Sequence, residues 1–402
     1  MLGIASQNVR WVASFDGSPQ EVATDESYPS TRIGYIQVAG VLVQLDQMLQ
    51  QGQMELVDPA VIRNAIEVSL HSMVLPSSNV CRMDMPTVRD SWRAEIYEIF
   101  RDYTVEGTSL LQVYMHLVKY GANRTAGNKV LLSRCSVSPH CSGRDIDVPM
   151  EGCACPSCGE WLFSTDALRL HEEVSEENEN ATALGRFMSV IEHMTLMAYL
   201  YYLSQRQPRI LGTVGFILDG PLAVFGPQSW FHTAILGFLK DMRENLLRQH
   251  LRMPVIVGIE KGGLFAEHAQ TIADRIPRRH LMMLPDEYIY QHIVTFRSSS
   301  NTSFGRDTYY GQKFIYKTSQ GKLLTITIPK ISTGALDPYH ARHYSFLPDT
   351  LGLLDRVGTS LYENAVIPIA LAHSYASIPL RTGSKVLTLL SRELLGQNGI
   401  AA

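Results

Sequence analysis

The segment GTVGFIL (residues 212–218) is followed directly by Asp-Gly-Pro at 219–221. Its residues are apolar or small, which is typical of a buried β-strand, and Asp-Gly-Pro marks the end of that strand. Further along, the pattern predicts a helix at about 229–248, a strand over 254–259 and a helix near 263–275. This alternation of strand and helix predicts a mixed α/β sheet with helices on its faces.

Toward the N-terminus, a strand of the same kind is predicted at about 9–15 (VRWVASF), ending at Asp16-Gly17-Ser18. Residues 32–46 are rich in Val and Ile, which favours extended structure. Helix-like spacing of apolar residues covers 59–75 and 87–120.

On the C-terminal side, a long helix is predicted at about 183–204. Short antiparallel strands are predicted for YIYQHIVTF (288–296), KFIYKT (313–318) and KLLTITIP (322–329), and a helical region begins near 350. We therefore expect a sheet-and-helix core interrupted by a large insertion. Its predicted parts are residues 1–50 for the first part of the core, 51–180 for a helical insertion with a cysteine-rich module at about 135–171, and 181–402 for the remainder.

Composition excludes several classes of protein. The 402 residues include 35 Lys and Arg against 39 Asp and Glu, a net charge of −4, and 45% are hydrophobic. A globular core is therefore expected, and binding of nucleic acid over the whole surface is excluded. No apolar run reaches the roughly 18 residues of a membrane span, so we expect no membrane partner and a cytoplasmic location.

Two short segments are alike: VASFDGS at 12–18 and GFILDGP at 215–221. In each, an apolar run leads into Asp-Gly, so Asp16 and Asp219 would lie at the carboxyl ends of buried strands, where α/β proteins place their ligands. Two carboxylates held close together repel each other unless a cation such as Mg²⁺ or Mn²⁺ lies between them. The alternative is that each Asp caps a turn, because Asp-Gly is common in turns.

The cysteine-rich module contains a C-x-x-C-G knuckle at Cys155 and Cys158, and a second pair about 20 residues upstream at Cys135 and Cys141. Four thiolates are the usual ligands of a structural Zn²⁺. These four are our predicted ligands, although three other possible ligands are close by: His140, Cys153 and His171. A thiol redox pair is the alternative interpretation.

Residues 271–343 hold ten Lys and Arg against five acids, with aromatic residues interleaved. Positive side chains that follow phosphates, with aromatic rings for base stacking, are typical of a single-strand channel. The predicted DNA contacts are Arg278, Arg279, Tyr309, Tyr310 and Lys313. The alternative is a solvated β-hairpin region whose aromatic residues belong to the core.

Four motifs occur in the order seen in NurA-type nucleases: VASFDGS (12–18), GFILDGPLAVFG (215–226), VIVGIEKGG (255–263) and IPIALAHSYASIP (367–379). The sequence resembles that family along most of its length, except for the cysteine-rich module and much of 50–180. The resemblance implies an RNase H-like fold and a Mn²⁺-dependent (or Mg²⁺-dependent) deoxyribonuclease. It also implies cleavage of single strands, 5′-to-3′ processing of ends, a homodimer, and a hexameric HerA-type ATPase partner in end resection or phage defence.

The resemblance also assigns roles to five residues. It makes Asp16 and Asp219 the metal-binding aspartates. Glu192 is the glutamate on the helix before the central strand and would be a further ligand of the Mn²⁺. His373 matches the family's C-terminal histidine, which would complete the metal shell or assist the leaving oxygen, and Lys261 would neutralise charge on the scissile phosphate. In the alternative interpretation, Glu192 faces solvent and His373 is a core residue.

Glu260 precedes Lys261, at the position where the family's lysine is expected. It is predicted to be a further metal ligand or a salt-bridge partner. The second hypothesis for the whole chain is a non-catalytic, zinc-containing adaptor that uses an RNase H-like core to dock DNA and an ATPase.

Overall fold

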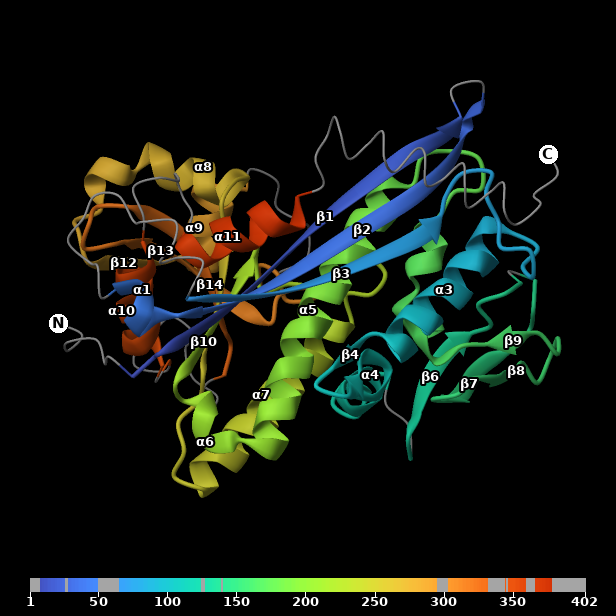
Figure 1. The fold of residues 1–402 in the computed structure, drawn as a ribbon, viewed down its shortest axis with the longest axis horizontal. Coiled ribbons are helices and arrows are strands. Elements are labelled where there is room, and N and C mark those ends of the chain that lie inside the picture. The colour runs from blue at the N-terminus through green and yellow to red at the C-terminus, as the bar shows by residue number, and fades with distance from the viewer. Residues whose placement is uncertain are drawn as a thin grey trace.

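The protein is built around one large mixed sheet, shown in the computed structural model of Figure 1. The structure describes residues 8–25, 28–49, 65–123, 127–138, 140–294, 303–331, 344, 346–358 and 366–377. The order of the eight strands is β12-β13-β14-β11-β10-β1-β2-β3. Their bounds are β1 Trp11–Asp25, β2 Tyr28–Gln44, β3 Ile66–Pro76, β10 Val214–Asp219, β11 Val255–Glu260, β12 His280–Met283, β13 Gly311–Lys317 and β14 Leu323–Pro329.

The middle of the sheet has RNase H-like topology. Strands β1, β10 and β11 are parallel neighbours, whereas β2 pairs antiparallel with both β1 and β3. The order β3-β2-β1-β10-β11, with β2 alone reversed, is the order of ribonuclease H-like folds. The predicted fold class is therefore confirmed.

The strand predicted to end at Asp16-Gly17-Ser18 continues instead to Asp25. Asp16 pairs with Ala39 and Ser18 with Gln37 in β2, and β1 and β2 remain paired along nearly their whole length. The ladder of hydrogen bonds to β2 outweighs the local tendency of Asp-Gly to turn, because a strand is stabilised mainly by its neighbours. The predicted end of this strand is therefore wrong.

The helix-like spacing at 59–75 is also misleading, because Ile66–Pro76 forms strand β3 at the edge of the sheet. Short apolar runs do not distinguish helix from strand by periodicity alone, and pairing with β2 decides the outcome here. The main sheet thus includes residues that the expected division at residue 50 had placed in the insertion.

Of the three predicted antiparallel strands, β13 and β14 are confirmed. In the first segment, YIYQHIVTF, Tyr288 to His292 belong to helix α9 (Asp286–His292), and residues from 295 lie outside the described part. Pro285 lies at the N-cap, and Asp286 and Glu287 in the first turn favour a helix electrostatically, which explains why the strand prediction is wrong.

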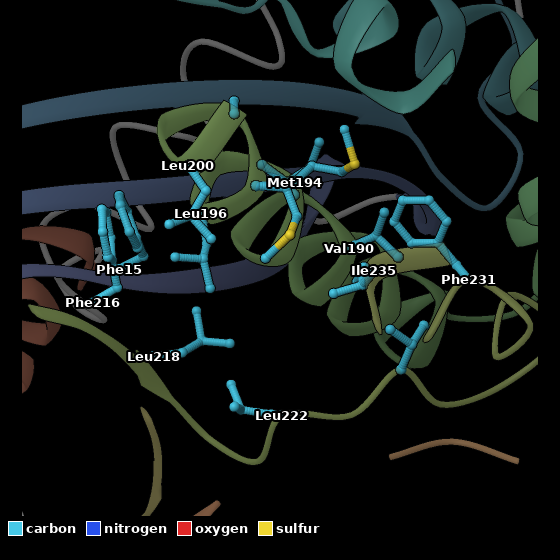
Figure 2. Packing of buried hydrophobic residues seen from close by; sticks show 14 of the residues in the cluster. Phe15, Val190, Met194, Leu196, Leu200, Phe216, Leu218, Leu222, Phe231 and Ile235 are labelled. Carbon is cyan, nitrogen blue, oxygen red and sulfur yellow. The ribbon is translucent and has the colours of Figure 1, made fainter. Parts of the chain in front are cut away.

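Helices cover both faces of the sheet. Figure 2 shows Phe15, Phe216 and Leu218 of the sheet facing Leu196 and Leu200 of α5 (Ala181–Arg206). Gly215, whose neighbour Phe216 faces α5, meets the opposite layer: a Cβ built on it would lie 2.5 Å from Leu353 of α10. The helices are α1 Leu45–Leu49, α5, α6 Pro208–Leu211, α7 Phe231–Arg248, α8 Leu264–Thr271, α9, α10 Leu347–Val357 and α11 Ile367–Ala376.

Between β3 and α5 the chain forms a lobe that lies beside α5 in Figure 1 and shares its hydrophobic core with the sheet. The helical pattern predicted at 87–120 is two helices, joined through a short hairpin. An ion pair between Arg93 and Asp166 (2.6 Å) is almost fully buried in the lobe. The elements of the lobe are α3 Val88–Asp102, β4 Thr104–Val105, β5 Thr108–Ser109, α4 Leu110–Val118, β6 Lys129–Arg134, β7 Arg144–Pro149, β8 Cys153–Ala154 and β9 Trp161–Leu162. Among the described residues, no helix has both the length and the apolar character needed to span a bilayer.

Candidate metal-binding active site

Asp16 and Asp219 lie side by side on neighbouring parallel strands. Phe15 pairs with Leu218, so Asp16 and Asp219, the next residues of the two strands, lie at the same level of the sheet. Beyond this level the strands separate: β10 ends at Asp219 and turns at Gly220 (φ 104°), whereas β1 continues with β2. Ligands in α/β proteins bind outside the carboxyl ends of parallel strands, which is where these two aspartates lie.

His373 brings a third element to the same place. One ligand atom each from Asp16, Asp219 and His373 lies within 4.8 Å of the other two. His373 is in the last turn of α11, and its Nδ1 lies 2.7 Å from Oδ2 of Asp16. Because the His373 side chain is 60% exposed, the interpretation as a core histidine is wrong.

The buried negative charges of this site favour binding of a cation. Burial, followed by the charge of Asp219, raises the pKa of Asp16 to about 6, although Lys261 and His373 act in the opposite direction. The carboxylate oxygens and imidazole nitrogen form a donor set that suits Mn²⁺. The residues present therefore fit a divalent cation, which would offset the repulsion that Lys261 alone leaves uncompensated.

Glu192 lies next to this group but does not belong to it. Its side chain is buried on α5, so the interpretation as a solvent-facing residue is wrong. Burial, and then the charges of Asp16 and Asp219, raise its pKa well above the ordinary value. Glu192 approaches β1 at Gly17, where a Cβ would lie 3.0 Å from its Oε1 and 2.6 Å from Cγ of Met188.

Gly17 is a site residue that the sequence reasoning missed. Its lack of a side chain lets Glu192 approach the strand directly beside Asp16. The only signal in the sequence is the glycine after Asp16, from which a turn is predicted.

Lys261 and Glu260, at the end of β11, have separate partners. Nζ of Lys261 lies 2.5 Å from Oδ2 of Asp219, so this lysine does reach the candidate site. Glu260 instead pairs with the buried Lys313. Of the two roles left open for Glu260, the structure favours the salt bridge.

The predicted DNA contacts are only partly compatible with the structure. Arg278 and Arg279 are exposed. Tyr310 and Lys313 are 0% and 2% exposed, and Tyr309 is also buried, so the prediction that these three contact DNA is wrong. Lys313 lies over the rings of Phe265 and Tyr309, 3.9 and 4.9 Å from their centroids. The positive charge of Lys313 therefore interacts with these aromatic rings inside the fold.

Four cysteines form a second candidate metal site, in the lobe. The Sγ atoms of Cys135, Cys141, Cys155 and Cys158 all lie within 4.8 Å of one another. The knuckle turns at Gly159 (φ 80°), whose N–H donates to the carbonyl oxygen of Cys155. The three other possible ligands are not members of the group: His140, Cys153 and His171. The structure thus brings together the four residues predicted.

Comparison with known proteins finds similarity only among solved structures. No family model matches the sequence, and no curated protein matches it. The crystal structure of the NurA nuclease from Sulfolobus solfataricus aligns over 99% of this chain and 88% of that chain, with 8% identity and a TM-score of 0.41. A second crystal structure of NurA aligns over 100% and 91%, with 11% identity and a TM-score of 0.27. We infer the function from the geometry of the site.

Proposed function

We propose that the protein is a metal-dependent nuclease that hydrolyses the phosphodiester bonds of DNA. The observation that supports this most is the convergence of Asp16, Asp219 and His373, whose ligand atoms lie within 4.8 Å of one another. Two carboxylates and an imidazole at the ends of parallel strands form a site for a divalent cation, Mn²⁺ or Mg²⁺. When bound, such a cation activates water and neutralises charge on a phosphodiester.

The residues of the chain have distinct parts in this proposal. Asp16 and Asp219 hold the cation, with Glu192 beside them as a further acidic group. Lys261, already paired with Asp219, would lie beside the phosphate and balance its charge. His373 is exposed enough to meet the substrate, so it either completes the metal shell or gives a proton to the departing 3′ oxygen.

A structural Zn²⁺ in the lobe is a further part of the proposal. Four thiolates fill a tetrahedral site and leave no position for a reactive water, so the ion would stabilise the lobe and take no part in hydrolysis. The short hairpin β8–β9 and the knuckle turn supply little apolar core of their own. A metal is a common substitute for such a core in small modules.

The finer activity follows from the resemblance. We propose single-stranded DNA and DNA ends as substrates, with 5′-to-3′ processing, a homodimer as the working form, and a HerA-type hexameric ATPase as partner. Co-purification with such an ATPase, and measurement of molar mass by light scattering, would test the two assemblies. Exposed Arg278 and Arg279 are consistent with a surface that follows phosphates.

The decisive experiment compares Asp16→Asn with the wild type. We expect Mn²⁺-stimulated degradation of labelled single-stranded DNA by the wild type and none by the variant. Asp102→Asn is the matched control, because Asp102 is exposed on α3 and pairs only with Arg101 in the described residues. A non-catalytic adaptor would bind DNA without cutting it, and an unchanged cleavage rate in Asp16→Asn would refute the nuclease proposal.

A further inference from the structure

A cavity of about 180 Å³ lies between the N-terminal half of α5 and the segment that follows β10. The volume corresponds to about six water molecules at liquid density, which is enough for a small planar ring system. Val190 and Phe231, both labelled in Figure 2, form part of its apolar wall. Glu192 immediately precedes His193 in α5, and Asp219 ends β10, just before the segment that supplies the other wall.

His193 lines this cavity and is only 3% exposed. Its Nδ1 lies 2.8 Å from the carbonyl oxygen of Ser189, and since a carbonyl only accepts, Nδ1 carries the proton. Burial favours the neutral ring, so Nε2 is a hydrogen-bond acceptor. Within the described residues, Nε2 is buried and has no hydrogen-bond partner.

Gln228 lines the same cavity and is 1% exposed. Its Oε1 is likewise buried without a hydrogen-bond partner among the described residues. Buried polar atoms are almost always paired in proteins, so the two unpaired acceptors around this cavity require a hydrogen-bond donor there, supplied by water or by a bound ligand.

The mouth of the cavity carries an aromatic ring and a cation. Phe225 is 45% exposed and meets Tyr309 edge to face, with ring centroids 5.6 Å apart. Exposed aromatic rings of this kind stack on the bases of single strands. The guanidinium of Arg186 lies against Gly226 (φ 89°), where a Cβ would be 1.9 Å from Nη1, and it also pairs with Glu173 at 2.7 Å. A side chain at position 226 would displace this cation.

We propose that this cavity binds one unpaired base of the DNA substrate, an inference that rests on the proposed nuclease function. His193 Nε2 and Gln228 Oε1 accept hydrogen bonds from the base edge, Phe225 stacks at the mouth, and Arg186 faces the attached phosphate. Adenine, cytosine and guanine carry amino groups that donate to such acceptors. Thymine presents one N–H between two carbonyl oxygens, which would face the protein acceptors unfavourably, so thymine binds weakest.

Binding is tested with fluorescent single-stranded oligonucleotides that differ at one position, which is A, C, G, T or abasic. Anisotropy is measured in EDTA, so that no cleavage occurs. For the wild type we expect at least about tenfold weaker binding of the thymine and abasic forms than of the best amino-bearing form. The variants His193→Phe and Gln228→Leu should lose this discrimination.

Gln228→Leu removes a buried oxygen that has no partner among the described residues, whereas His193→Phe keeps an aromatic ring but loses the hydrogen bond from Nδ1 to Ser189. Thermal unfolding verifies that both variants are folded. His116→Phe is the control, because His116 packs among Tyr120, Tyr201 and Phe238, away from the cavity. Hydrolysis of bis(p-nitrophenyl) phosphate, which has no base, measures catalysis by the wild type without any contribution from a base pocket.

The failures of the two proposals can be told apart. The base-pocket proposal is overturned if the wild type does not discriminate between bases. It is also overturned if folded His193→Phe and Gln228→Leu still discriminate. If the wild type discriminates between bases but cleaves neither DNA nor the base-free diester with Mn²⁺, the pocket stands and the nuclease proposal falls.

Discussion

Lys261 at the end of β11 reaches the neighbouring strand β10, where its Nζ lies 2.5 Å from Oδ2 of Asp219. The lysine therefore forms an ion pair with a carboxylate that we propose as a ligand of a divalent cation. Replacement of its charge should have opposite effects on metal binding and on catalysis. In Lys261→Met, we expect tighter Mn²⁺ binding by calorimetry, because the competing cation is gone. Hydrolysis of DNA should fall about a hundredfold, because phosphate charge is no longer balanced. Weaker Mn²⁺ binding in this variant would show that Lys261 organises the ligands and does not compete.

The close packing of α5 against Gly17 predicts that a side chain at this position would clash with Met188. A Cβ in Gly17→Ala would lie 2.6 Å from Cγ and 2.8 Å from Sδ of Met188. We expect a loss of about 1–3 kcal/mol in the free energy of unfolding, measured by urea denaturation. The double variant Gly17→Ala/Met188→Ala removes the clash and should recover part of that loss. Strictly additive effects would show that the loss does not arise from the contact with Met188.

Burial of the acidic groups predicts how stability depends on pH without metal. The pKa of Asp16 is raised from 3.8 to about 6, and that of Glu192 is raised well above 4.5. The folded state therefore binds more protons than the unfolded state, and stability should fall as pH rises from about 4 through 6 and beyond. Glu192→Gln should flatten this fall and stabilise the metal-free protein at pH 8. Thermal unfolding in EDTA at several pH values measures both effects. If the unfolding temperature of the wild type does not change with pH, the raised pKa values of Asp16 and Glu192 are contradicted.

The four-cysteine group predicts one zinc ion in the lobe. Elemental analysis should find about one zinc per chain in the wild type and almost none in Cys155→Ser. Because structural zinc contributes directly to folding, a strong chelator should also lower the unfolding temperature of the wild type. Cys153→Ser is the matched control, since Cys153 belongs to the same module but not to the group. Loss of zinc in that variant would show that the ligand set is different.

Arg278 and Arg279 remain the testable part of the predicted DNA surface. Both are exposed on the turn before β12. Charge reversal in Arg278→Glu/Arg279→Glu should weaken binding of single-stranded DNA at 50 mM salt by about tenfold or more, and reduce its dependence on salt. Arg101→Glu, an exposed arginine on α3, serves as the control. Unchanged affinity at low salt would remove this surface from the DNA path.

Local sequence was a good guide where a segment carries its own signal. The buried strands β10 and β11, the long helix α5 and the cysteine knuckle were predicted close to their observed bounds. Predictions failed where a neighbour decides the outcome: β3 exists because β2 offers it an edge, and Asp16 continues a strand because β2 pairs with it. Lys313 and Tyr310 looked like DNA contacts because the pattern of charge and rings does not reveal which side chains are buried.

The amino-acid sequence by itself determined which groups are present for chemistry: two Asp-Gly strand motifs, a histidine near the C-terminus and four closely spaced cysteines. Apolar periodicity and turn residues are local properties, so they can be recognised without knowledge of the fold. Only the tertiary structure decided that Asp16, Asp219 and His373 meet, that Glu192 lies beside Gly17, and that His193 and Gln228 share a cavity. Those relationships depend on strand order and helix packing, which bring together residues far apart in the chain and set the burial that gives each polar group its chemistry.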